Sequence, residues 1–121
     1  HVFNFDKNFI NLIKECDFCI TRAGASTLAE LFILKIPFLA IPLPSSKDNH
    51  QHENAKFYKN RNCCWLLEEK KMNDKILYNL LKDIILNKKN FNIKKKSIIE
   101  LNKEISWKNQ NNIIMKEFNN D

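Results

Sequence analysis

Residues 17–34 constrain the fold most, because three kinds of pattern follow one another there. Residues 18–20 form an apolar run typical of a buried strand, and the turn after them holds Gly24, the only glycine among 121 residues. Leu28, Leu31 and Phe32 then recur at helical spacing. This order predicts a strand over 17–21, a tight turn, and a helix over 26–34.

The same alternation continues through the first half of the chain. Apolar runs predict further strands over 37–43 and 63–67, and helical patterns cover 6–15 and 50–60. Strands separated by helices of this length pair in parallel through right-handed crossovers. The sequence therefore predicts an α/β fold around a parallel sheet.

The second half is predicted to be helical and is assigned no chemistry. Apolar residues recur as pairs four apart from Ile76 to Ile85, which gives one helix with an apolar stripe. Ile98, Ile99 and Ile105 indicate another helix, and residues 107–118 a last one. We expect 1–67 to form the α/β part and 73–121 the helical part.

The chain is basic, with a formal net charge of +6, which favours anionic partners. Lysines at 88–89 and 94–96 flank apolar residues of a predicted helix, and a solvated helix face explains them better than a nucleic-acid patch. A basic nucleic-acid-binding domain stays as an alternative. The longest apolar run, 36–43, is far shorter than the roughly 20 residues that span a bilayer.

Four cysteines raise the question of a metal. Cys16 and Cys19 have the spacing of a zinc or redox pair, but Cys19 falls in a predicted strand. Cys63 and Cys64 are adjacent in another strand and must point to opposite faces, so buried free thiols are predicted instead. His50 and His52 lie two apart and do not share a helix face. No metal or cofactor is predicted.

The turn at Gly24 has the features of an anion site. The start of a helix leaves backbone N–H groups unpaired and carries a partial positive charge, so it can hold a phosphate. Gly24 removes the Cβ that would obstruct a ligand approaching the backbone. The alternative is a capping box, in which Thr27 and Glu30 satisfy the first helical turn and bind nothing else.

A second loop, 43–49, leaves the next strand at the same edge of the sheet, where ligands of parallel α/β proteins bind. It leads into a helix start that carries His50, Gln51 and Asn54. Amides and a histidine there suit recognition of hydroxyl groups, which donate and accept hydrogen bonds. An ordinary polar helix start explains the same residues.

The motifs of the two loops, taken together, resemble a known family. Residues 22–30 (RAGASTLAE), 36–37 (IP), 41–44 (IPLP) and 48–55 (DNHQHENA) are similar to the C-terminal domain of the MurG family. These are peptidoglycan N-acetylglucosaminyltransferases that convert lipid I to lipid II. The resemblance covers about 3–67 by motif. It implies the Rossmann-like C-terminal half of a GT-B fold, with C-terminal helices, for residues 1–121.

The resemblance also implies a site for the donor UDP-N-acetylglucosamine. Backbone amides near Ala25 and Ser26, with the Thr27 hydroxyl, would face the diphosphate, and Glu30 would accept hydrogen bonds from the ribose. Gln51 with His50 would contact the sugar. The implied contact set is Asp6 (through its backbone, to uracil), Gly24, Ala25, Ser26, Thr27, Leu28, Ala29, Glu30, His50, Gln51 and Asn54. Asp6 and His50 depart from the family's usual residues.

The family's catalytic base and acceptor loops belong to an N-terminal domain that these residues do not include. The resemblance therefore implies an inverting transferase, peripheral to the cytoplasmic face of the bacterial inner membrane, of which this chain supplies the donor site and no catalytic residue. The lipid-linked acceptor would meet the N-terminal domain, and no nucleic acid is expected. Alternatives are another UDP-sugar GT-B transferase, or a donor-binding subunit with a separate membrane-anchored partner.

Overall fold

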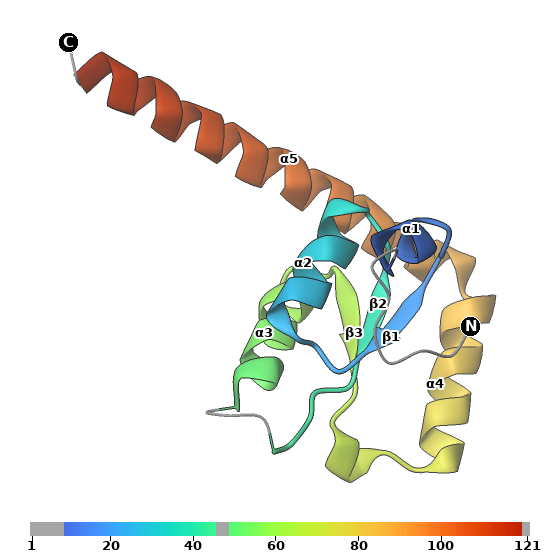
Figure 1. Ribbon diagram of the computed structural model, residues 1–121. Coiled ribbons are helices and arrows are strands. Elements are labelled where there is room, and N and C mark those ends of the chain that lie inside the picture. The colour runs from blue at the N-terminus through green and yellow to red at the C-terminus, as the bar shows by residue number, and fades with distance from the viewer. Residues whose placement is uncertain (1–8, 46–48, 120–121) are drawn as a thin grey trace.

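The computed structural model describes residues 9–45 and 49–119 and shows a parallel sheet covered by helices on both faces (Figure 1). The strands are β1 (Cys19–Thr21), β2 (Phe38–Ala40) and β3 (Cys64–Leu66), ordered β1-β2-β3. Cys19 pairs with Phe38, and Phe38 pairs with Cys64, in parallel register. The predicted α/β fold with a parallel sheet is confirmed.

The helices form two layers around this sheet. The helices α1 (Phe9–Lys14), α2 (Ala25–Ile33) and α3 (His50–Lys59) contribute to one face, and α4 (Asp74–Leu86) covers the other. A short 3-10 helix, η2 (Glu69–Lys71), follows β3. Helix α5 (Lys88–Asn119) starts beside the sheet and extends well past it (Figure 1). The predicted start of the first helix, at residue 6, lies outside the described residues.

The central strand divides the core into two. Phe38 packs with the buried leucines of α2, whereas the next residue, Leu39, packs with Trp65 and with Ile84 of α4. This follows from the strand geometry, in which successive side chains point to opposite faces. A strand buried on both faces reads as a continuous apolar run, which is how residues 36–43 appear in the sequence.

Each strand is three residues long, shorter than predicted. Ladder hydrogen bonding continues one residue further, because Ile41 N donates to Thr21 O at 2.8 Å and Leu67 N to Ala40 O at 3.0 Å. Pro37 and Pro42 bracket the central strand and have no N–H to donate. The apolar pattern thus marks the buried segment, whereas the prolines limit the pairing.

The C-terminal half has one helix fewer than predicted. Residues 88–119 form the single helix α5, where the sequence suggested a break before Trp107, and that prediction is wrong. The reason is that no proline or glycine occurs between 88 and 119. Ile98 of α5 is buried with Phe32 and Cys63, and Asn102 Nδ2 donates to Phe32 O at 2.8 Å. These contacts fix α5 against the end of α2.

Lys94 corrects the prediction that the lysine clusters are solvated. The residue is buried, with only 5% of its surface exposed, and its Nζ donates to Asn62 Oδ1 at 2.7 Å. The ammonium also lies 5.4 Å from the centre of the Trp65 ring. Burial, followed by the charge of Lys59, lowers the pKa of Lys94. The lysines at 88, 89, 95 and 96 are exposed as predicted.

The cysteines are free thiols in different environments. Cys16 is exposed, whereas Cys63 and Cys64 are fully buried and belong to separate parts of the core. Burial, with a smaller contribution from Cys63, raises the pKa of Cys64 to about 12. Cys63 precedes β3, so the two are not neighbouring strand residues as predicted: Cys64 packs with the core cluster of Phe38, and Cys63 packs with Phe32 and Ile98. The prediction of buried thiols is confirmed for these two and is wrong for Cys16.

Candidate functional site

The turn after β1 is held by side chains from two elements. Ala23 has a φ of 71°, a left-handed conformation that costs an alanine roughly 1 kcal/mol. Its N–H donates to Thr21 Oγ1 at 3.2 Å, and its carbonyl accepts from Asn54 Nδ2 of α3 at 3.4 Å. Both backbone groups of this buried residue are therefore paired, which offsets the cost of the turn.

Gly24 is not required by the chain itself. Its φ of −63° and ψ of 139° are extended values that any residue adopts. A Cβ built at this position meets no atom within 4 Å. Conformation and internal packing would therefore both accept a side chain at 24. What the glycine provides is open access to the backbone at the start of α2.

The helix starts one residue earlier than predicted, and this excludes the capping box. Gly24 is the N-cap and Ala25 the first helical residue, so Thr27 lies within the first turn and is not a cap. Gly24 has no side-chain oxygen to accept from the first turn. The first intrahelical hydrogen bond runs from Leu28 N to Gly24 O, so the amides of residues 25–27 have no acceptor within the helix and point out of its end.

The predicted contact residues on α2 differ in exposure. Ala25 and Ser26 are exposed, and Gly24, Thr27, Ala29 and Glu30 are partly exposed. Leu28 differs, because its side chain is fully buried in the core and its N–H donates to Gly24 O at 3.0 Å. The structure thus places Leu28 in the core and not among the surface residues of the turn.

The start of α3 holds both neighbouring loops. Asn49, with a φ of 61°, precedes the helix. Gln51 Oε1 accepts from Leu43 N at 2.7 Å, while Asn54 bonds to the β1–α2 turn. The structure therefore brings Gln51 and Asn54 together with the Gly24 turn at the carboxyl edge of the sheet. His50 is exposed at the same helix start. Asp6 lies outside the described residues.

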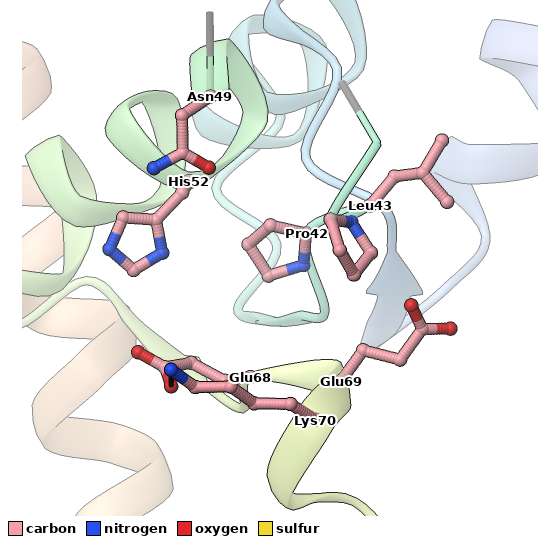
Figure 2. A pocket seen from close by; sticks show the side chains of 8 residues that line it. Pro42, Leu43, Asn49, His52, Glu68, Glu69 and Lys70 are labelled. Carbon is pink, nitrogen blue, oxygen red and sulfur yellow. Dashed lines mark ion pairs between the residues drawn. The ribbon is translucent and has the colours of Figure 1, made fainter. Parts of the chain in front are cut away.

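A pocket of about 240 Å³ opens between the loops that follow β2 and β3, and no residue of the Gly24 turn lines it (Figure 2). Pro42, Leu43 and Pro44 form one wall. The start of α3 provides Asn49 and His52, and the segment after β3 provides Glu68, Glu69 and Lys70. The site was predicted on the loops after the first two strands, and these three residues were not among its members. Because β3 runs parallel to β1 and β2, it ends at the same edge, which is the signal that places them there.

Ion pairs form within the segment that follows β3, and another joins this segment to the turn after β1. Lys70 and Lys71 each lie 3.6 Å from Glu68 Oε2, and these two charges hold the pKa of Glu68 below its usual range. Glu69 Oε1 is 2.9 Å from Arg22 Nη2. Arg22 Nη1 also donates to Ile41 O at 3.4 Å, so the ends of all three strands are tied together.

The chemistry of this edge is that of polar recognition. Unpaired helix-start amides suit an anion, and the amide and carboxylate side chains around them suit hydroxyl groups. Among residues 9–45 and 49–119, no group of three or more His, Cys, Asp or Glu side chains is arranged to hold a metal ion. No helix in the same ranges is long and apolar enough to cross a bilayer.

Fold and site together define a parallel α/β domain whose candidate site lies at the carboxyl edge of the sheet, around a helix start. The model of the glycosyltransferase family 28 C-terminal domain matches residues 1–110. The chain therefore belongs to the glycosyltransferase family 28 C-terminal domain family.

Two relatives of this chain are named as N-acetylglucosamine transferases. It is 50% identical over 110 residues to a UDP-N-acetylglucosamine–N-acetylmuramyl-(pentapeptide) pyrophosphoryl-undecaprenol N-acetylglucosamine transferase of Pelagibacter ubique, covering 91% of the chain and 31% of that protein. The enzyme of the same name from Rickettsia massiliae is 38% identical over 100 residues, covering 83% and 27%. The chain thus spans less than a third of these relatives.

A solved structure has the same fold. The crystal structure of Acinetobacter baumannii MurG superposes with a TM-score of 0.68 at 24% identity, over 82% of this chain and 27% of that one. This similarity confirms the expected Rossmann-like C-terminal half of a GT-B fold.

Proposed function

We propose that this chain supplies the donor site of an inverting N-acetylglucosaminyltransferase, which transfers N-acetylglucosamine from its UDP conjugate to lipid I and forms lipid II. The observation that carries the proposal is the glycine at 24, which neither the backbone conformation nor the packing of the chain requires. The names of the relatives agree with this substrate pair. The whole activity belongs to a protein longer than these residues.

The diphosphate of the donor would lie against the start of α2. The amides of Ala25 and Ser26 and the hydroxyl of Thr27 lie at a helix end whose partial positive charge favours an anion. Without a Cβ at Gly24, a phosphate oxygen can approach the backbone closely. Leu28 contributes to this arrangement as a core residue that anchors the turn.

The sugar rings would be recognised by side chains around the same turn. The Glu30 carboxylate suits two ribose hydroxyls, because an ionised acceptor makes the stronger hydrogen bonds. Gln51, with His50, is proposed to meet the N-acetylglucosamine hydroxyls, and the backbone at Asp6 the uracil. Asn54 is also proposed to contact the donor, in addition to the hydrogen bond that its amide donates to the carbonyl of Ala23.

The proposed reaction inverts the anomeric carbon. The acceptor hydroxyl attacks this carbon and its proton passes to a base outside these residues. The bond to the diphosphate breaks on the opposite side, and UDP leaves with the electron pair. Negative charge grows on the diphosphate, where each well-placed N–H typically contributes a few kcal/mol of stabilisation, about 2.7–4 kcal/mol in the best-studied case.

The test is calorimetric binding of UDP-N-acetylglucosamine to the complete gene product. Replacing Thr27 and Glu30 together by alanine should weaken binding at least tenfold, because two donor contacts are lost. The matched control is Ser97→Ala with Glu100→Ala, a hydroxyl and a carboxylate at the same spacing on α5. Equal donor affinity in the Thr27/Glu30 variant and the control would refute the proposed site.

Competition decides between this donor and other UDP-sugars. UDP-glucose and UDP-galactose should compete more weakly than UDP-N-acetylglucosamine, and the reverse order would favour another transferase of the same fold. Residues 1–121 alone are expected to show no transfer, because the proposed base lies elsewhere. We also propose that the full protein works at the cytoplasmic face of the inner membrane, where its lipid-linked acceptor would be found.

A further inference from the structure

Arg22 connects the Gly24 turn to the ends of the other two strands. It directly precedes Ala23, the residue in the left-handed conformation. Its Nη1 donates to Ile41 O, after β2, at 3.4 Å, and its Nη2 lies 2.9 Å from Glu69 Oε1, after β3. One guanidinium thus contacts two loops that are distant in sequence.

The geometry of this pair suits positioning. Glu69 lies 47 residues from Arg22 and belongs to η2. Arginine donors are arranged in a planar fork, which fixes direction as well as distance. The two side chains are 49% and 33% exposed, so their attraction is screened by water and salt and contributes only modestly to folding stability. The more specific effect of the ion pair is on the conformation of the adjacent turn at residues 22–24.

We propose that Glu69 and Arg22 are positioning residues for donor binding, a role that rests on the function proposed above. Their ion pair holds the turn at 22–24 so that the first amides of α2 face the donor's diphosphate. Glu69 acts through Arg22, and Arg22 acts through the backbone of Ala23 and Gly24. Neither side chain is assigned a contact with the sugar nucleotide.

A double-mutant cycle in the complete gene product tests this. Glu69→Gln should weaken UDP-N-acetylglucosamine binding roughly twofold to fivefold, the range expected for a partly exposed ion pair. Arg22→Gln should weaken it by at least as much, since the bond to Ile41 O is lost too. Adding Glu69→Gln to Arg22→Gln should have no further effect. Arg22→Lys, which keeps the charge, should restore part of the affinity.

Kinetics and a control separate positioning from general stability. The KM for the donor should rise in Glu69→Gln while the KM for the acceptor stays unchanged, because only the turn is displaced. Glu104→Gln is the matched control, since it breaks an exposed ion pair to Lys108 at 3.2 Å on α5 and should bind the donor normally. In 1 M salt the difference between the wild type and Glu69→Gln should shrink.

Two outcomes overturn the inference. Unchanged or tighter donor binding in Glu69→Gln, with weaker binding in Arg22→Gln, would mean that Arg22 contacts the ligand itself. Equal losses in donor and acceptor KM would mean a general structural role. In both cases the wild type still binds UDP-N-acetylglucosamine, so the proposed function stands. A wild type that does not bind this donor overturns both proposals.

Discussion

Replacing Gly24 by alanine should separate donor affinity from folding stability. The residue has an extended conformation, and an added Cβ meets nothing within 4 Å. Alanine reduces the conformational freedom of the unfolded chain, which stabilises by about 0.4–1 kcal/mol at a compatible position. Alanine is also a poorer N-cap than glycine, by about 0.5–1 kcal/mol. These effects oppose each other, so the free energy of unfolding should change by less than about 1 kcal/mol.

Donor affinity should respond very differently to the same methyl group. If a phosphate oxygen lies against the backbone at 24, the Cβ displaces it from the amides at the start of α2. Losing one hydrogen bond to a charged group costs about 1.5–3 kcal/mol. This corresponds to a dissociation constant that is roughly 10-fold to 150-fold higher, that is, to weaker binding.

Both quantities can be measured on one preparation of the complete gene product. Urea denaturation gives the free energy of unfolding, and calorimetry gives the affinity for UDP-N-acetylglucosamine. Normal affinity in Gly24→Ala would refute the idea that the ligand approaches the backbone here. A large loss of stability would instead refute our account of the glycine's conformation and surroundings.

Three further predictions concern the core and the helices. Because burial raises the pKa of Cys64 to about 12 from 9.0, the folded state keeps a proton that the unfolded state loses. The free energy of unfolding should fall by about 1.4 kcal/mol per pH unit between pH 9 and 12, and Cys64→Ala should flatten this slope in denaturation at several pH values. The melting temperature of Lys94→Met at pH 7 should match or exceed that of the wild type, because burial disfavours the charge of Lys94 and the exposed Asn62 can bond to water instead. A clearly lower melting temperature would show that the pair of Lys94 and Asn62 stabilises the fold. Asn73→Ala removes the side-chain oxygen that accepts from Ile76 N at 2.9 Å, and thermal unfolding should show a cost of about 1 kcal/mol if this cap is formed in solution.

The order of elements was predictable because each leaves a local pattern. The apolar run over 36–43 and the helical spacing after Gly24 were enough to predict a parallel α/β sheet, which the structure confirms. The break in the last helix was predicted wrongly, because no residue near Trp107 ends a helix. Burial of Lys94 was missed because it depends on a tertiary contact with Asn62.

The candidate site was predictable in part for the same reason. The turn at Gly24 and the start of α3 have local signals, and the structure places them together through the bond from Asn54 to Ala23. The conformation of the turn had no signal, since alanine, and not glycine, takes the left-handed position. The link from Arg22 to Glu69 spans the sheet, and only the register of the strands brings the two together.

The packing of α4 and α5 determines how this domain can be shortened. Leu39 and Trp65 are covered by Ile84 of α4, and Cys63 by Ile98 of α5. A truncation after residue 67 would leave those apolar surfaces in water and would be expected to aggregate. Any minimal soluble version of this domain must therefore extend at least through Asn102, whose side-chain amide donates to Phe32 O in the last turn of α2.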